Sequence, residues 1–150
     1  MTMAQTPETT GRRLQCVVVT PERAVVDEPA DFVALPLYDG EIGILPGRAP
    51  LVGRLGYGEL RVRYGGQTKR FFVDGGFVQV RANVVTVLTA RAVPAEQINP
   101  AAAAQALRQA EGPGAKASPE ERQKAQERAR AQLRVARHAH GVPLGQEAIG

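Results

Sequence analysis

The sequence of 150 residues is poor in the residue types that support disulfides, metal sites and aromatic cores. Cys16 is the only cysteine, which excludes an internal disulfide, and its apolar neighbours predict a buried small side chain. Tryptophan is absent and only 5% of residues are aromatic, so Val, Leu, Ile and Ala must fill the core. His138 and His140 stand two positions apart, but no third metal ligand is evident beside them. We therefore expect no metal and no cofactor.

Segments that direct a chain to or across a membrane, and familiar catalytic motifs, are also missing. The first 13 residues contain no apolar stretch of a secretory signal, and we expect residues 1–13 to be a disordered extension. No apolar run approaches the roughly 20 residues that span a bilayer. The sequence has no G-x-x-x-x-G-K-[ST] loop and no H-E-x-x-H motif. We expect a non-catalytic protein, and if it works at a membrane, another component must hold it there.

Short β-branched runs, separated by Gly, Pro and Asp, occupy residues 14–93. Residues 59–64 and 68–73 flank a Gly-Gly pair, and 59–64 alternates apolar with charged side chains, which is typical of a strand with one solvated face. Residues 74–76 and 82–83 predict turns into two further strands. Antiparallel strands with one apolar side each must bury that side against a second sheet. The segment therefore predicts an antiparallel β-sandwich.

From residue 94 onward the composition changes to Ala, Gln, Glu and Arg, which favour helices. Asn99-Pro100 predicts the start of one helix. Ser118-Pro119-Glu120-Glu121 predicts the start of a second helix through a capping box. We expect a two-helix hairpin over residues 94–140, followed by a flexible tail over 141–150.

The predicted hairpin has little apolar surface. Its first helix offers Leu107 and an alanine face, and its second helix has one apolar side, formed by Ala125, Ala129, Leu133 and Ala136. An alanine seam buries little area, and burial stabilises by only about 25 cal/mol per Å². We expect the hairpin to pack loosely on the sandwich and to be able to detach.

The formal net charge is +4, and the second predicted helix carries a basic surplus. Its basic residues are Arg122, Lys124, Arg128, Arg130, Arg134 and Arg137. A solvated face with ion pairs three or four residues apart explains such a helix. A basic β-sandwich module that binds nucleic acid is the alternative, although the helix lacks stacking aromatics and a recognised motif.

Residues 39–51, DGEIGILPGRAPL, form the most distinctive segment, which we call the signature segment. Asp39-Gly40 predicts a tight turn, and Gly43 predicts a bulge or a close backbone contact. Pro46 and Pro50 have no N–H to donate to a sheet. Generic turn chemistry would explain these features, but the whole string resembles the "dGe.GiLpgHaPl" pattern of the epsilon subunit of bacterial F-type ATP synthase.

The resemblance extends from about Leu14 to His138. VDGGFVQVRANVVTVLTARAV is similar to the family's "sGG..eV..n.vtVLad.A" stretch, and AQLRVARHA is similar to the usual end of its last helix. The resemblance implies a non-catalytic rotor subunit of the central stalk of a proton-transporting synthase, peripheral on the cytoplasmic face of the bacterial plasma membrane. It implies that the sandwich binds the gamma subunit and rests on the membrane c-ring, coupling rotation to ATP synthesis.

In this family the signature loop faces the c-ring, which makes Asp39, Glu41 and Arg48 the candidate contacts; the family usually has His where this chain has Arg48. The hairpin in the family can extend into the alpha/beta head and block ATP hydrolysis. The positions that match its contacts to the beta subunits are Arg122, Arg128, Arg130 and Arg134.

Some relatives also bind ATP through an I/L-D-x-x-R-A motif at the first helix. The corresponding stretch here is INPAAA, residues 98–103, with Asn99 and Ala102 in place of the Asp and the Arg. The carboxylate and the cation of that motif are both absent. We therefore expect no nucleotide-binding site.

Overall fold

A computed structural model describes residues 13–112 and 118–139. Most of the predicted N-terminal extension, and the predicted tail, lie outside the described residues. The strands are β2 Leu14–Val19, β3 Ala24–Ala30, β4 Phe32–Leu37, β5 Gly40–Ile44, β6 Leu51–Tyr64, β7 Gln67–Arg81, β8 Val84–Leu88 and β9 Ala92–Pro94. The helices that follow are the 3-10 turn η2 Ala95–Gln97, α1 Pro100–Glu111 and α2 Pro119–Ala139.

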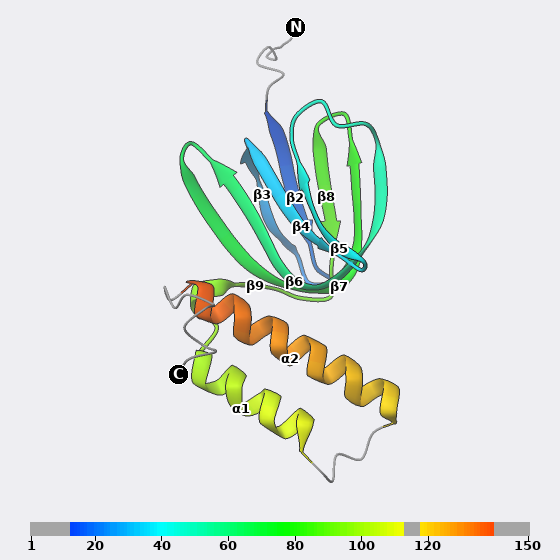
Figure 1. The fold of residues 1–150 in the computed structure, drawn as a ribbon. Helices are drawn as coiled ribbons and strands as arrows, with labels where there is room; N and C mark the ends of the chain where they lie inside the picture. Colours follow the sequence, from blue (N-terminus) through cyan, green and yellow to red (C-terminus); the bar gives the residue numbers. More distant parts are fainter. Residues whose placement is uncertain (1–12, 113–117, 140–150) are drawn as a thin grey trace, which may run out of the picture.

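One hydrogen-bonded sheet, in the order β3-β2-β8-β7-β6-β4-β5 with β9 beside β7, forms both layers of the sandwich (Figure 1). Layer 1 contains β3, β2 and β8 with the C-terminal half of β7 and the N-terminal half of β6. Layer 2 contains β9, β4 and β5 with the other halves of β7 and β6. The predicted β-sandwich followed by two helices is confirmed. The pairing of β2 with β8 is parallel, so the sandwich is not antiparallel throughout.

The strands β6 and β7 bend from one layer into the other at glycines. Gly76 has φ 111°, and a Cβ there would lie 1.9 Å from the carbonyl oxygen of Leu88, so that only glycine fits. Val73 and Val78 both point into the core although they are five residues apart, because the bend reverses the alternation of side chains. The turn predicted at residues 74–76 is therefore wrong: one continuous strand bends there.

The core lies between the inner faces of the two layers. Its fully buried side chains include Cys16, Val18, Val33, Leu35, Leu60, Val62, Val78, Val80, Val85 and Val87. Leu60 and Val62 are the apolar positions of the alternation predicted in β6. Cys16 is buried, as predicted, and burial raises the pKa of its thiol to about 12.

Both predicted helix starts are confirmed. The Asn99 side-chain oxygen accepts hydrogen bonds from the Ala101 and Ala102 amides at 2.8 and 3.3 Å. At the start of α2, the Glu121 amide donates to Ser118 Oγ at 3.1 Å and the Ser118 amide donates to Glu121 Oε1 at 3.0 Å. These hydrogen bonds with Ser118 lower the pKa of Glu121. Of the helices in the described part of the chain, none is long and apolar enough to cross a bilayer.

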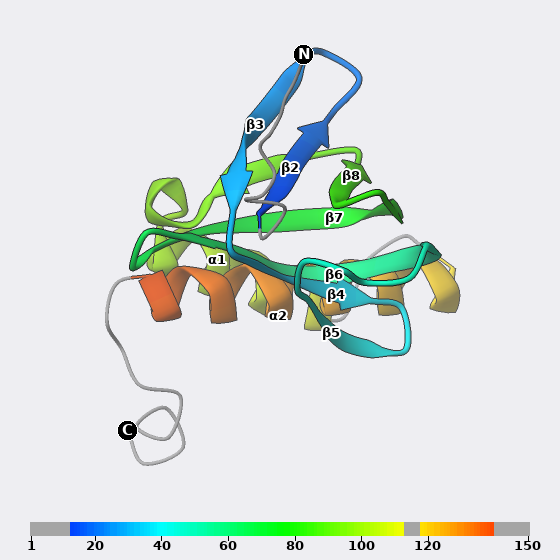
Figure 2. The ribbon, with the colours of Figure 1, turned by 90° about the horizontal axis from the view of Figure 1, so that it is seen from above.

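The helix α2 runs along β6 and β7 and covers the outer face of layer 2 (Figure 2). The predicted alanine side is confirmed at Ala129, Leu133 and Ala136, which are buried. A second buried stripe, which was not predicted, contains Ala131 and Val135. These two side chains form a small cluster with Phe72 of β7 and Ala95 of η2, separate from the main core.

Candidate interaction surfaces

The signature segment forms the turn before β5, the strand β5 itself and the loop that follows it. The predicted turn is confirmed at Asp39, between β4 and β5. A Cβ at Gly43 would lie 2.8 Å from Cε1 of Phe32, so a close approach at Gly43 is confirmed, but to an aromatic side chain. Pro46 and Pro50 both lie in the loop that follows, outside the strands.

The loop at residues 45–50 is fixed by Asn83. The Gly47 amide donates to the Asn83 side-chain oxygen at 2.8 Å, while the Asn83 carbonyl accepts from the Gln15 amide at 2.8 Å. Asn83 has φ 63° in the predicted turn between β7 and β8. Figure 1 shows this loop and this turn together at the end of the sandwich away from the helices. Arg48 is exposed in the fixed loop.

The three candidate c-ring contacts do not lie together. Asp39 precedes β5 and Arg48 follows it, so the two residues are at opposite ends of the strand. The Glu41 carboxylate, between them, faces Arg61 of β6 at 3.1 Å. Only Arg48 therefore lies in the loop that Asn83 fixes.

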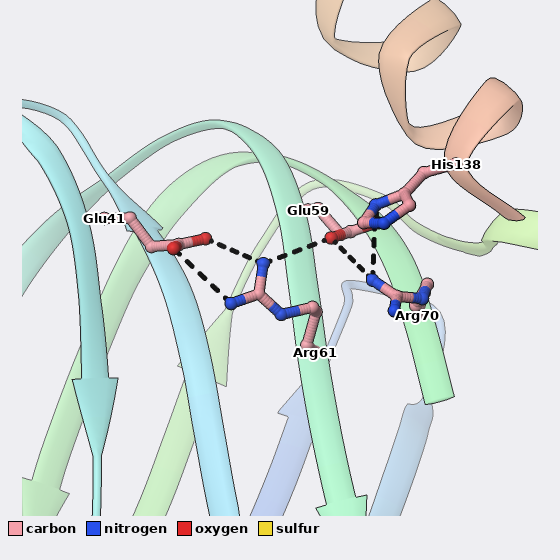
Figure 3. Close-up of polar contacts among 5 residues, drawn as sticks. All are labelled: Glu41, Glu59, Arg61, Arg70 and His138. Carbon is pink, nitrogen blue, oxygen red and sulfur yellow. Dashed lines mark hydrogen bonds and ion pairs between the residues drawn. The ribbon is translucent and has the colours of Figure 1, made fainter. Parts of the chain in front are cut away.

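Glu41 belongs to a polar network that reaches α2 (Figure 3). Arg61 contacts both Glu41 and Glu59, at 3.1 and 3.3 Å. The same Glu59 oxygen accepts from Arg70 of β7 at 3.1 Å, and its other oxygen lies 3.1 Å from Nδ1 of His138. The network thus joins β5, β6 and β7 to the last turn of α2.

Glu59 is the centre of this network. Its side chain is only 11% exposed, so the carboxylate depends on the basic groups around it. His138, considered above as one of a metal pair, lies against Glu59 and Arg70, and His140 is outside the described residues. Within residues 13–112 and 118–139, no group of three or more His, Cys, Asp or Glu side chains could hold a metal ion.

A second ion pair holds the N-terminal half of α2. Nε of Arg128 donates to Oδ1 of Asp74 at 2.9 Å, and the guanidinium lies 5.1 Å from the centre of the Tyr57 ring. The hydrogen bond to Asp74 raises the pKa of Arg128. The Asp74 side chain, like that of Glu59, is 11% exposed. The two acidic side chains therefore contact α2 on either side of its apolar cluster.

The four arginines predicted to contact beta subunits have different surroundings. Arg128, Arg130 and Arg134 line an open cleft of about 830 Å³ between α2 and the bend of β6 and β7. Arg130 pairs with Glu111 of α1 at 3.2 Å, and Arg134 is exposed. Arg122 lies outside this cleft, and its buried Nε has no hydrogen-bond partner among the described residues. The structure thus brings three of the four together.

The outer face of layer 1 carries an exposed apolar surface that sequence reasoning missed. We call it the outer apolar face: Val17, Val19, Val52, Phe77, Val84 and Leu88. Cross-strand pairing places Phe77 beside Leu88, and Val52 is 76% exposed. The run NVVTVL offered a signal, because adjacent apolar residues in a strand occupy both of its faces.

The two departures from the ATP motif both lie at the start of α1. The Asn99 side chain is used as the N-cap, and the Ala102 amide is one of its two donors. The Asn99 side chain therefore has a structural role in the helix, whereas Ala102 contributes only its backbone amide. The absence of a nucleotide site stays a prediction.

Residues 13–95 match the family model described as "ATP synthase, Delta/Epsilon chain, beta-sandwich domain". The chain is 50% identical over 128 residues to the ATP synthase epsilon chain of Rhodopirellula baltica, covering 83% of this chain and 98% of that one. It is 45% identical over 94 residues to the ATP synthase epsilon chain of Pelotomaculum thermopropionicum, covering 63% of this chain and 70% of that one.

Two solved structures have similar folds. A chain of the Euglena gracilis mitochondrial ATP synthase, in a structure of OSCP, F1 and c-ring, has a TM-score of 0.71 and 25% identity, covering 86% of this chain and 81% of that one. A chain of the Tetrahymena thermophila central stalk and c-ring structure has a TM-score of 0.58 and 16% identity, covering 84% and 95%. The second likeness concerns the fold alone.

Proposed function

This chain belongs to the family of ATP synthase epsilon chains, and from that premise we propose that it couples c-ring rotation to ATP synthesis as a non-catalytic rotor subunit. It would bind the gamma subunit through its sandwich, rest on the c-ring, and lie peripherally at the cytoplasmic face of a bacterial membrane. The proposal of a non-catalytic role is supported by the sequence, in which we found no catalytic motif.

The observation that carries the proposal is the outer apolar face. Phe77 is 57% and Leu88 is 51% exposed, and they adjoin each other on neighbouring strands. Contiguous exposed apolar side chains on a soluble domain mark a protein contact. We assign this face to the gamma subunit. Its burial against gamma would hold the sandwich in place and leave the helices free on the other layer.

Capture of a purified gamma subunit by the full chain tests this assignment. We expect Phe77→Glu to weaken capture roughly thirtyfold, because replacing an exposed aromatic ring of an interface by a charged side chain costs about 2 kcal/mol or more. Gln67→Glu, at the exposed start of β7, is the matched control and should bind like the parent chain. Equal binding by both variants would show that gamma uses another surface.

For the c-ring contact we propose Arg48 ahead of Asp39 and Glu41. Arg48 lies in the loop fixed by Asn83, whereas Asp39 lies at the other end of β5 and Glu41 is paired with Arg61. A permanently charged guanidinium suits polar or acidic loops on the ring. We expect Arg48→Glu to reduce ATP-driven proton pumping in reconstituted vesicles, while Asp39→Lys leaves it nearly unchanged. A larger effect of Asp39→Lys than of Arg48→Glu would place the c-ring contact at the other end of β5.

We also propose that the helices inhibit ATP hydrolysis when they extend. The basic cleft residues Arg128, Arg130 and Arg134 are the contacts to acidic segments of the beta subunits. A hairpin held by a small apolar cluster and a few polar contacts suits a two-state element, because a few kcal/mol decide its position. Reconstituted enzyme with a chain that ends at Ile98 should hydrolyse ATP faster than enzyme with the full chain. An unchanged rate would refute inhibition.

A further inference from the structure

Two acidic side chains of layer 2 hold α2 against the sheet. Asp74 binds Arg128, and Glu59 faces His138 nearly three turns further along the same helix. The positions 128, 131, 135 and 138 are three or four residues apart and therefore lie on one face of α2. Ala131 and Val135, between the two polar contacts, pack on Phe72.

Arg128 has two competing uses. In the docked helix its Nε–H is given to Asp74 at 2.9 Å, and its guanidinium is stacked near Tyr57. An acidic segment of a beta subunit would need the same guanidinium in the extended hairpin. The α2 helix cannot be on the sandwich and inside the head at once, so the two contacts exclude each other.

We propose that Asp74 is a built-in competitor for the acidic partner of Arg128, and that it thereby sets how often the hairpin is released. This inference rests on the proposed inhibition. Asp74 offers the same chemistry as an acidic segment, a carboxylate, and it is in a nearly buried position where a hydrogen bond to a charged group is strong. Removing its charge lowers the affinity of the sandwich for α2 without touching any residue of the helices.

The ion pair between Arg130 and Glu111 provides the matched control. Both partners belong to the hairpin, one to each helix, so they move together when the hairpin is released. Glu111→Gln removes a carboxylate partner of a cleft arginine, as Asp74→Asn does, but leaves the contacts between hairpin and sandwich in place. It should therefore leave the release equilibrium unchanged.

Hydrogen exchange of the full chain measures release directly, because exchange of α2 amides depends on how often the helix opens. We expect Asp74→Asn to speed exchange in α2 roughly tenfold, the effect of losing one charged hydrogen bond that is partly exposed on the Arg128 side. Exchange in β8, inside layer 1, should stay as in the parent chain and so separates release from global unfolding. Arg128→Gln removes the same pair from the helix side and should speed α2 exchange similarly.

The same variants separate the two halves of the inference in the reconstituted enzyme. Asp74→Asn frees a helix that keeps Arg128, so ATP hydrolysis should fall below that of the parent. Arg128→Gln frees a helix without that residue, so hydrolysis should not fall. Parent-like α2 exchange in Asp74→Asn would overturn the competitor role. Faster α2 exchange with equal ATP hydrolysis in both variants would show that Arg128 does not contact a beta subunit. Equal hydrolysis by enzyme with the full chain and enzyme with the chain ending at Ile98 would instead refute the proposed inhibition itself.

Discussion

The outer faces of the two sandwich layers share the strands β6 and β7, but only the outer face of layer 2 is covered by a helix. On layer 1, Phe77 of β7 is 57% exposed within the outer apolar face; on layer 2, Phe72 of the same strand is completely buried under α2. The covered face, on layer 2, has Glu59 and Asp74 close to Phe72, whereas on the bare face, the outer apolar face of layer 1, Phe77 adjoins the exposed Leu88. If α2 is released as proposed, the carboxylates of this face become exposed to water, where charged groups are stable. The bare face suits a lasting partner.

Removing the bend that creates the two faces should have the largest effect. Gly76→Ala places a Cβ against the Leu88 carbonyl and forces φ 111° on alanine, so we expect the free energy of unfolding to fall by about 4 kcal/mol or more. Urea denaturation followed by circular dichroism measures it. Gly65→Ala, at φ 59° with nothing within 4 Å of the added Cβ, should cost only about 1–2 kcal/mol. Similar losses in both variants would contradict the importance of the close approach.

Two phenylalanines in one strand give the most direct comparison of the faces. Phe72→Ala empties the cluster under α2 and should reduce the free energy of unfolding by about 3 kcal/mol. Phe77→Ala should change stability by less than about 0.5 kcal/mol, since the ring is largely in water. It should nevertheless weaken gamma capture, which Phe72→Ala should not. Equal losses of stability in Phe72→Ala and Phe77→Ala would mean that Phe77 is covered in solution.

The polar part of the covered face has a smaller expected effect. Glu59→Gln leaves Arg61, Arg70 and His138 without their shared carboxylate, and we expect a loss of about 2 kcal/mol. Glu41→Gln is the matched control at the exposed end of the same network, where the carboxylate is 52% exposed and the loss should stay below about 0.5 kcal/mol. Thermal unfolding by calorimetry compares them. A larger loss at Glu41 would place the centre of the network in β5.

The smallest expected effect is a pH dependence at the start of the covering helix. Hydrogen bonds with Ser118 lower the pKa of Glu121, so its contribution is present above the ordinary pKa of a glutamate. It is lost as the pH falls through the lowered pKa. Helix content measured by circular dichroism should therefore decrease slightly in acid, and Ser118→Ala should weaken that dependence. An unchanged acid titration in Ser118→Ala would assign the dependence to other carboxylates.

Local chemistry made the helices and most strands predictable. Asn99 and Ser118 start helices because their side chains bond nearby amides, which depends only on residues two or three positions away. Leu60 and Val62 alternate with charged residues along one strand, and both are buried. A glycine pair suits a turn as well as a bent strand, so residues 74–76 predict a turn where the structure has a bend. The Leu88 carbonyl that decides between them belongs to another strand.

The contacts that join distant elements were not predictable in the same way. Glu59 and His138 are 79 positions apart in the sequence, and nothing local to either residue indicates the other. The family resemblance predicts one surface for the signature segment, but Asp39 and Arg48 lie at opposite ends of β5. The stripe of Arg128, Ala131, Val135 and His138 does have helical spacing. However, its only apolar members are one alanine and one valine, so the sequence does not distinguish this buried stripe from a solvent-exposed side of the helix.

The continuity of β6 and β7 through both layers has a mechanical consequence. In a sandwich of two separate sheets, the layers are joined by side-chain packing and by the connecting loops. Here the covalent backbone itself passes from the bare face to the face beneath the helices, and the two strands stay paired along almost their whole length. A twisting load applied at Phe77 would therefore be carried to layer 2 along two covalent strands and along the ladder of hydrogen bonds between them.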